Sequence, residues 1–252
     1  MGKLLKQQRR GKGHKSLAYR APSHKYKAEL MYRLADKKEM EEGYLAKIVD
    51  FIDDPARGAL LMEVVLEDAS RQMLLAPEGA MLGGTIYYGA GPKMSLGSVM
   101  PLSKIPDGAY IYNLELSPGD GGKMVRAPGS HALVVSHEGK KVIVKLPSKD
   151  TLTLEANCRA QVGVTSGGGR LEMPLMKAGA NFYKKHAQNR KWPVNRGVHM
   201  AAYTHPFGGK QHHRGRSSSV ARGAPPGRKV GHIASRSTGR GSGQRSRNVS
   251  SK

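Results

Sequence analysis

The chain has 252 residues and a formal net charge of +23 at pH 7, from 42 lysine and arginine residues against 19 aspartate and glutamate residues. A charge of this size opposes compaction unless a polyanion neutralises it, which favours nucleic acid as the partner, with an anionic membrane surface as the second candidate. The single cysteine, Cys158, excludes an internal disulfide and favours a reducing compartment such as the cytoplasm.

The two ends of the chain differ in charge from its centre. Residues 1–27 carry nine basic and no acidic side chains, and residues 173–252 carry seventeen basic and none acidic. Residues 28–172 hold the other sixteen basic and all 19 acidic side chains. Mixed charge suits a folded body, whereas arms of one sign repel themselves until they meet anions. Neither arm has an apolar helical face, and no run of about 18 apolar residues exists, so we expect no membrane association.

The first predicted elements follow an irregular basic stretch, Gln7–Lys15. A short turn of helix is expected within Glu29–Glu42. Short apolar or β-branched runs, separated by turn residues such as Asp53-Asp54-Pro55, then predict strands. These strands are Tyr44–Ile52, Ala59–Leu66, Arg71–Leu75 and Thr85–Tyr88.

A second series of short strands is predicted after Pro106-Asp107-Gly108. It comprises Ala109–Leu116, Ala132–Ser136, Val142–Leu146, Thr151–Glu155 and Gln161–Thr165. Short strands with a turn every 8–12 residues or so are typical of small barrels and sandwiches, so a mainly β chain with two compact barrels, OB-like or SH3-like in size, is expected. Gly167-Gly168-Gly169 should end the folded part, and the low-complexity stretch Ser235–Lys252 should be disordered on its own.

Signatures of an enzyme are absent from the sequence. The Gly-Lys steps at residues 122 and 209 are followed by Met124 and Gln211, not by the serine or threonine of a P-loop. The adjacent pair Asp53-Asp54 precedes a proline and is interpreted as turn chemistry rather than as an acid–base pair. No Gly-x-Ser-x-Gly motif supports a serine nucleophile.

A metal site is weakly indicated at most. Cys158 has no cysteine neighbour, as a zinc knuckle would require. His205, His212 and His213 would share a metal only with a further ligand from elsewhere. We interpret them instead as RNA-contacting or solvated residues of a cationic arm, although a metal-dependent hydrolase stays the third hypothesis.

The positive pattern is that of RNA binding. Basic residues alternate with glycine and are punctuated by aromatics, as in Phe182-Tyr183-Lys184-Lys185-His186 and Arg190-Lys191-Trp192-Pro193. Glycine lets the backbone approach phosphates, arginine binds them through two hydrogen bonds, and aromatic rings stack on unpaired bases. Trp192 fits base stacking and the capping of a barrel core equally well. On this pattern alone, a chromatin protein or a general RNA chaperone remains open.

An ordered set of motifs extends almost end to end. It comprises Asp54-Pro55-Ala56-Arg57, Leu75-Ala76-Pro77-Glu78-Gly79, Ile105-Pro106-Asp107-Gly108, Asn113-Leu114-Glu115, Pro118-Gly119-Asp120-Gly121-Gly122, Arg126-Ala127-Pro128-Gly129, Leu146-Pro147-Ser148, Asn157-Cys158-Arg159-Ala160, Gly179, Arg190-Lys191-Trp192-Pro193, Arg196-Gly197-Val198 and His205-Pro206-Phe207-Gly208-Gly209. In this order the motifs resemble the L-two family of universal large-subunit ribosomal proteins. The archaeal and eukaryotic branch is indicated by Arg20-Ala21-Pro22-Ser23-His24, by residues 224–231 and by Ser237-Thr238-Gly239-Arg240.

This resemblance implies four parts. An OB-like barrel over residues 37–103 would precede an SH3-like barrel over residues 104–172. Basic extensions over residues 1–36 and 173–252 would thread into ribosomal RNA. The family's turn arginine falls on Arg57 and its loop arginine on Arg126, and both are implied to grip RNA.

The resemblance further implies a structural, non-enzymatic constituent of the large subunit of the cytoplasmic ribosome. Such a protein would act in translation, in the assembly of the peptidyl transferase region and in subunit association. Its partners would be large-subunit rRNA, neighbouring ribosomal proteins and, at the subunit interface, small-subunit rRNA. No small-molecule substrate and no cofactor are expected, with Mg²⁺ present only as part of the surrounding rRNA.

The residues expected to bind rRNA lie in both extensions and in the loops of both barrels. They are Arg9, Arg10, Lys12, His14, Lys15, Arg20, Arg57, Lys123, Arg126, Arg159, Arg190, Lys191, Trp192, Arg196, His205, Gly208, Gly209, His212, Arg228, Lys229, Arg236 and Arg240.

The loop that precedes His205 departs from the family pattern. Ala201-Ala202-Tyr203-Thr204 stand where the family usually has Asn-Pro-Val followed by an acid, and Lys210 replaces a third glycine. Residues 173–252 contain no carboxylate that would orient the His205 ring. We therefore expect His205 to contact RNA or to shape the loop, and not to transfer protons.

Overall fold

The structure is a computed structural model that describes residues 26–55, 57–90, 94–209, 212–235 and 238. Within this range the chain forms two units, one up to residue 174 and one from residue 175 onward. We call them the barrel body and the C-terminal unit. The predicted division of the chain at residues 36, 103 and 172 stays a prediction.

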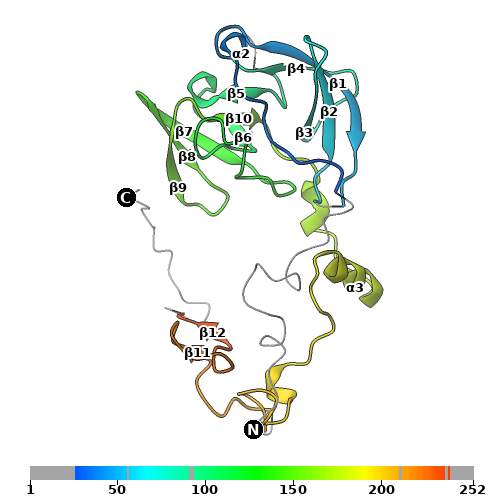
Figure 1. The fold of residues 1–252 in the computed structure, drawn as a ribbon, viewed down its shortest axis with the longest axis vertical. Coiled ribbons are helices and arrows are strands. Elements are labelled where there is room, and N and C mark those ends of the chain that lie inside the picture. Colours follow the sequence, from blue (N-terminus) through cyan, green and yellow to red (C-terminus); the bar gives the residue numbers. More distant parts are fainter. Residues whose placement is uncertain (1–25, 56, 91–93, 210–211, 236–237, 239–252) are drawn as a thin grey trace. The chain divides into compact units, whose positions relative to one another are not determined.

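The barrel body is built on a sheet of ten strands (Figure 1). Along the sheet the strand order is β3-β2-β1-β4-β5-β10-β6-β7-β8-β9, with all neighbours antiparallel except β4 and β5. The strands are β1 (Tyr44–Ile52), β2 (Leu61–Leu66), β3 (Arg71–Leu75), β4 (Thr85–Tyr88), β5 (Val99–Pro101), β6 (Tyr110–Tyr112), β7 (Ala132–Glu138), β8 (Lys141–Lys145), β9 (Thr151–Glu155) and β10 (Arg159–Val162). Short helices are α2 (Lys37–Glu41), η2 (Leu102–Lys104) and η3 (Gly168–Leu171).

Each half of this sheet encloses its own apolar core. In β1 the residues Tyr44, Ala46 and Ile48 are buried and their neighbours are exposed, which is the alternation of a strand with one face inside. They pack with side chains of β2, β3 and β4. In the second half, Val142 and Val144 of β8 pack with side chains of β6, β7, β9 and β10. The mainly β fold, an OB-like barrel followed by an SH3-like barrel, is therefore confirmed.

The two barrels share a buried joint. Tyr112 of β6 packs with Leu61 and Leu75 of the first barrel, and its hydroxyl donates to the Leu75 carbonyl at 2.9 Å. The Gln161 side-chain amide donates to the same carbonyl at 3.2 Å and to that of Gly97 at 3.3 Å. Because the Tyr112 hydroxyl and the Gln161 amide both find acceptors in the first barrel, these polar groups favour one arrangement of the barrels.

A buried charge cluster lies beside the joint. Arg159 of β10 donates to Glu115 at 2.9 Å and to Glu39 of α2 at 2.8 Å, and all three side chains are almost fully buried. Its guanidinium also donates to the Arg33 carbonyl at 2.9 Å. Burial lowers the pKa of Arg159, but the hydrogen bonds to Glu115 and Glu39 outweigh burial and raise that pKa above its ordinary value. The cluster ties together α2, the first residues after β6, and β10.

Residues 26–36, which precede α2, run along the barrel body and are called the strap. Leu30 and Tyr32 are buried, and the Tyr32 hydroxyl donates to the Asn113 carbonyl at 2.5 Å. The Tyr32 amide donates to the Gly121 carbonyl at 3.2 Å, and the Arg33 amide donates to the Tyr88 hydroxyl at 2.9 Å. Residues expected to belong to an extension are thus bound to both barrels.

Most predicted strands are confirmed, and α2 falls inside the predicted helical stretch. β5 was missed because only three residues pair. β6 ends at Tyr112, earlier than predicted, since Asn113 takes a positive φ of 49°. β10 begins at Arg159 and ends at Val162, because Gly163 turns the chain at a φ of 115°.

The C-terminal unit contains regular structure that the sequence reasoning missed. It comprises α3 (Ala178–Ala187), η4 (Gly197–His199) and a parallel pair, β11 (Ser219–Val220) with β12 (His232–Ile233). Phe207, Val220 and Val230 are its buried apolar residues. The prediction that Gly167–Gly169 ends the folded part is therefore wrong for the described residues. No helix in the described part of the chain has the length and apolar character needed to cross a membrane.

We predict that Arg159→Met destabilises the protein by about 3–5 kcal/mol, because Glu39 and Glu115 would stay buried without their counter-charge. Urea unfolding of the full chain measures the change in the free energy of unfolding. Arg71→Met is the matched control, since Arg71 is exposed and its ion pair with Glu63 at 3.2 Å should contribute less than about 1 kcal/mol. Equal losses in both variants would contradict the structural role of the cluster.

We predict that His137 of β7 makes a pH-dependent contribution to the free energy of unfolding. Its ring nitrogens lie 2.9 Å from the Leu102 carbonyl and 2.6 Å from the Asp107 carboxylate, two acceptors that only the protonated ring satisfies together. The hydrogen bond to Leu102, opposed by burial and assisted by Asp107, raises the pKa of His137 above its ordinary 6.5.

Because the folded-state pKa is the higher one, this stabilisation is complete below about pH 6.5 and disappears as pH rises through the raised value. The free energy of unfolding of the natural protein should therefore exceed that of His137→Gln most at acidic pH. Urea unfolding of both proteins from about pH 6 to about pH 9 follows the difference. A difference independent of pH would show that the ring contributes no charged interaction.

Candidate nucleic-acid interface

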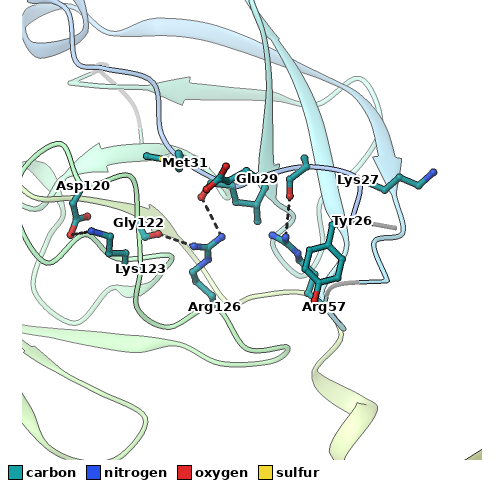
Figure 2. A pocket seen from close by; sticks show the side chains of 11 residues that line it. Tyr26, Lys27, Glu29, Met31, Arg57, Asp120, Gly122, Lys123 and Arg126 are labelled. Carbon is teal, nitrogen blue, oxygen red and sulfur yellow. Dashed lines mark hydrogen bonds and ion pairs between the residues drawn. The ribbon is translucent and has the colours of Figure 1, made fainter. Parts of the chain in front are cut away.

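A pocket of about 530 Å³ on the barrel body brings together the two arginines expected to grip RNA (Figure 2). Arg57 comes from the β1–β2 loop of the first barrel and Arg126 from the β6–β7 loop of the second. The remaining walls are the strap residues Tyr26, Lys27, Ala28, Glu29, Leu30 and Met31 and the loop residues Asp120, Gly122 and Lys123.

Arg57 is held in place by the turn that precedes it. Its amide donates to the Asp54 carbonyl at 3.0 Å, and its Nε lies 3.0 Å from the buried Asp54 carboxylate. Its Nη2 donates to the Ala28 carbonyl of the strap at 3.1 Å (Figure 2). The pair Asp53-Asp54 thus serves as a turn, as expected, and Asp54 aims the arginine at the pocket.

Arg126 is fixed from two sides. Nη1 donates to the Gly122 carbonyl at 3.0 Å and Nη2 donates to the Leu30 carbonyl at 3.3 Å. Gly122 has a φ of 80°, and a Cβ there would lie 2.6 Å from the Asn113 side-chain oxygen, so this position requires glycine. The Gly-Gly step of the motif therefore shapes the loop that holds the arginine.

Two acids organise the same loop from within. The Glu115 carboxylate accepts hydrogen bonds from the amides of Gly121 at 3.0 Å and Arg159 at 2.8 Å. Asp120 accepts from the amide of Leu116 at 3.1 Å and lies 3.4 Å from the Lys123 ammonium. The sequence reasoning did not assign these acids. The sequence offered one signal for this role: both acids flank the Pro118-Gly119 step. A carboxylate next to such a turn can accept hydrogen bonds from the amides of the loop.

The electrostatics of the pocket favour an anion. Burial lowers the pKa of the Arg126 guanidinium, and the positive charge of Arg57 lowers it further. Two cations that repel each other across a concave surface are stabilised together by a phosphate, which accepts hydrogen bonds from both. The lysines that line the pocket, Lys27 and Lys123, add positive charge, and Glu29 and Asp120 subtract part of it.

Helix α3 of the C-terminal unit presents aromatic and basic side chains to solvent. None of its residues is buried, and Phe182 and Tyr183 are exposed next to Lys184 and Lys185. Its last turn carries the basic residues, which interact favourably with the helix dipole. This exposure of rings beside cations suits stacking on unpaired bases.

The loop around His205 is closely packed. The His205 Nδ1 accepts a hydrogen bond from the Phe207 amide at 3.1 Å, and burial lowers the pKa of His205. A Cβ at Gly197 would lie 2.3 Å from this ring, and one at Gly208 would lie 2.3 Å from the Met200 carbonyl. Both glycines are required by close approach, so Gly208 shapes the loop, and the neutral ring keeps its proton on Nε2.

The remaining candidates in the C-terminal unit lie on or near its surface. Arg190, Lys191, Arg196, Gly209 and His212 are exposed, and Trp192, Arg228 and Lys229 are half-buried. Arg196 lies 2.6 Å from the His199 ring, which contacts the His212 ring at 4.3 Å between centroids. The Arg228 Nη1 atom is buried and has no hydrogen-bond acceptor among the described residues. The candidates Arg9, Arg10, Lys12, His14, Lys15, Arg20, Arg236 and Arg240 lie outside the described residues.

One predicted RNA contact is corrected. Arg159 is 2% exposed, and its guanidinium donates to Glu39, Glu115 and the Arg33 carbonyl. A phosphate cannot reach this side chain without opening the charge cluster. Arg159 is therefore a structural residue, whereas Lys123, also predicted, is exposed at the rim of the pocket.

The described residues contain no group of three or more histidine, cysteine, aspartate or glutamate side chains placed to hold a metal ion. Cys158 is a buried free cysteine, and burial raises its pKa to about 11.

Comparisons with known proteins show the family to which the chain belongs. Residues 1–88 match the family model described as "Ribosomal Proteins L2, RNA binding N-terminal domain", and residues 95–230 match "Ribosomal Proteins L2, C-terminal domain". Relatives named "Large ribosomal subunit protein uL2" occur in Methanopyrus kandleri and Haloarcula marismortui, both 45% identical over 96% of this chain and 99% of theirs. The relative of that name in Methanococcus vannielii is 47% identical over 95% of this chain and all of its own. The chain belongs to the L2 family of large-subunit ribosomal proteins.

Proposed function

We propose that this protein is a structural constituent of the large ribosomal subunit that binds large-subunit rRNA. The main observation in support of RNA binding is that Arg57 and Arg126, one from each barrel, line a single pocket. A rigid body that presents two arginines fixes the position of the RNA backbone, because loops anchored in a scaffold keep their contacts in place. Membership of the L2 family supports this assignment.

The basic residues outside the pocket supply affinity. Residues 173–252 carry seventeen basic and no acidic side chains, and each phosphate neutralised releases bound counterions. We assign neighbouring ribosomal proteins and, at the subunit interface, small-subunit rRNA as further partners. The protein acts in translation in the cytoplasmic ribosome, where it supports assembly of the peptidyl transferase region and subunit association. It needs no cofactor and no small-molecule substrate, and Mg²⁺ enters with the rRNA.

His205 has a role in loop shape and RNA contact rather than in catalysis. Its Nδ1 is occupied by the Phe207 amide, and its ring packs over Gly197. Residues 173–252 contain no carboxylate that would orient the ring for proton transfer. The Nε2–H of the neutral ring is left as a hydrogen-bond donor toward RNA.

Salt dependence tests the proposed contact. Arg57→Ala and Arg126→Ala should each weaken binding to large-subunit rRNA and lower the slope of log affinity against log salt by about 1, because one phosphate contact is lost. Filter binding or fluorescence anisotropy with the full chain measures both quantities. Arg71→Ala is the control, since Arg71 is an exposed arginine of the same body that does not line the pocket. Slopes equal to that of the natural protein would remove the pocket from the interface.

The identity of the RNA is tested in cells. Ultraviolet crosslinking followed by sequencing of the attached RNA should place crosslinks at a few sites of large-subunit rRNA. Crosslinked peptides should come from the loops of Arg57 and Arg126 and from both basic extensions. Crosslinks scattered over many RNAs, or found mainly on DNA, would instead support a general nucleic-acid binder or chromatin protein.

A further inference from the structure

We propose that the pocket receives one unstacked nucleotide of the rRNA, with its phosphate between Arg57 and Arg126 and its base against the ring of Tyr26. This inference rests on the proposed function, in which the pocket faces rRNA. It adds the kind of RNA element that is bound, a single splayed nucleotide rather than a duplex backbone, and it gives Tyr26 a role in binding.

The size of the pocket limits what enters it. A cavity of about 530 Å³ lies in the range of small-molecule sites, which is roughly 300–1,000 Å³. One nucleotide fits such a volume. An RNA duplex presents its phosphates on a convex surface and reaches only the rim, so two arginines inside a concave wall suit a nucleotide that is turned out of the base stack.

The charges divide the pocket into an anionic subsite and a second wall. Asp120 is engaged by the amides of Leu116 and Ser117 and by the Lys123 ammonium, so its charge is directed into its own loop. Arg57 shares its charge with the Asp54 carboxylate, 3.0 Å from its Nε, whereas the hydrogen bonds that hold Arg126 go to the carbonyl groups of Gly122 and Leu30 and leave its positive charge available to the pocket. A phosphate is the anion of a nucleotide that both guanidinium groups can bind.

The second wall is suited to a base. Tyr26 and Met31 both line the pocket, and their side chains are 39% and 53% exposed. Figure 2 shows the Tyr26 ring at the Arg57 end of the pocket. A ring next to an arginine is the combination on which unpaired RNA bases stack. An acidic peptide would also satisfy the arginines, but it brings no planar group for this wall.

The experiment tests in the full chain whether the Tyr26 ring contributes to rRNA affinity independently of the phosphate contacts. Affinity for in vitro transcribed large-subunit rRNA, and its salt slope, are measured for Tyr26→Ala, Tyr26→Phe and Tyr110→Ala. Loss of a stacked base should weaken Tyr26→Ala by about 5- to 150-fold. Its salt slope should not change, because no phosphate contact is lost. Tyr26→Phe keeps the ring and should bind like the natural protein, as should Tyr110→Ala, which removes a half-exposed ring of the same body outside the pocket.

The outcomes separate this inference from the function on which it rests. If Tyr26→Ala binds normally while Arg57→Ala and Arg126→Ala bind weakly, the nucleotide site is wrong and rRNA binding at the pocket stands. If all three bind normally, the proposed function of the pocket fails as well. Equal losses in Tyr26→Ala and Tyr26→Phe, or in Tyr26→Ala and Tyr110→Ala, would also overturn the inference.

A second measurement does not depend on substitutions. Large-subunit rRNA that contains 4-thiouridine is bound to the natural chain and irradiated, and the crosslinked peptides are identified by mass spectrometry. A uridine in the pocket should give a crosslink to the peptide that contains Tyr26, beside those from the basic extensions. Where the bound base is not uridine, rRNA that contains a photoreactive analogue of guanosine, adenosine or cytidine serves in the same way. Absence of that peptide with all four RNAs would overturn the inference.

Discussion

The burial of Arg159 between Glu39 and Glu115 is the constraint on which the barrel body depends. Removing three charges from water costs several kcal/mol per ion, and this cost is offset only when the hydrogen bonds are made together. Each partner comes from a different part of the chain: α2, the residues after β6, and β10. Both ion pairs of Arg159 are therefore made in one arrangement of strap and barrels, and alternatives leave a charge buried and unpaired.

That arrangement creates the pocket. Arg57 and Arg126 are 69 positions apart in the sequence and reach one cavity because the barrels share the joint around Tyr112 and the strap crosses both. The strap contributes backbone carbonyls at Ala28 and Leu30 that orient the two guanidinium groups. Glu115 links the two features directly, since its carboxylate binds Arg159 and also an amide of the loop that supports Arg126.

The C-terminal unit follows a different physical logic. Its buried apolar residues, Phe207, Val220 and Val230, are few, and its glycines are needed where chain segments approach closely. Exposed aromatic and basic side chains on α3 leave the surface suited to a polyanion. A small core with a large positive charge is consistent with a segment whose stability increases when phosphates neutralise it.

The sequence by itself determined most strands of the barrel body, the division into a neutral centre with basic ends, and the family, because alternation, turn residues and motif order are local properties. It also indicated Arg57 and Arg126 as separate contacts. Only the tertiary structure decided that they meet in one pocket, that Tyr26 lines it, and that Arg159 is unavailable to RNA. In the sequence, an arginine that faces solvent cannot be told from one that is buried between two carboxylates. Whether a charge is buried depends on partners that are distant in the sequence. Helix α3 escaped notice for a related reason, since a helix without a buried face lacks the apolar period by which helices are recognised.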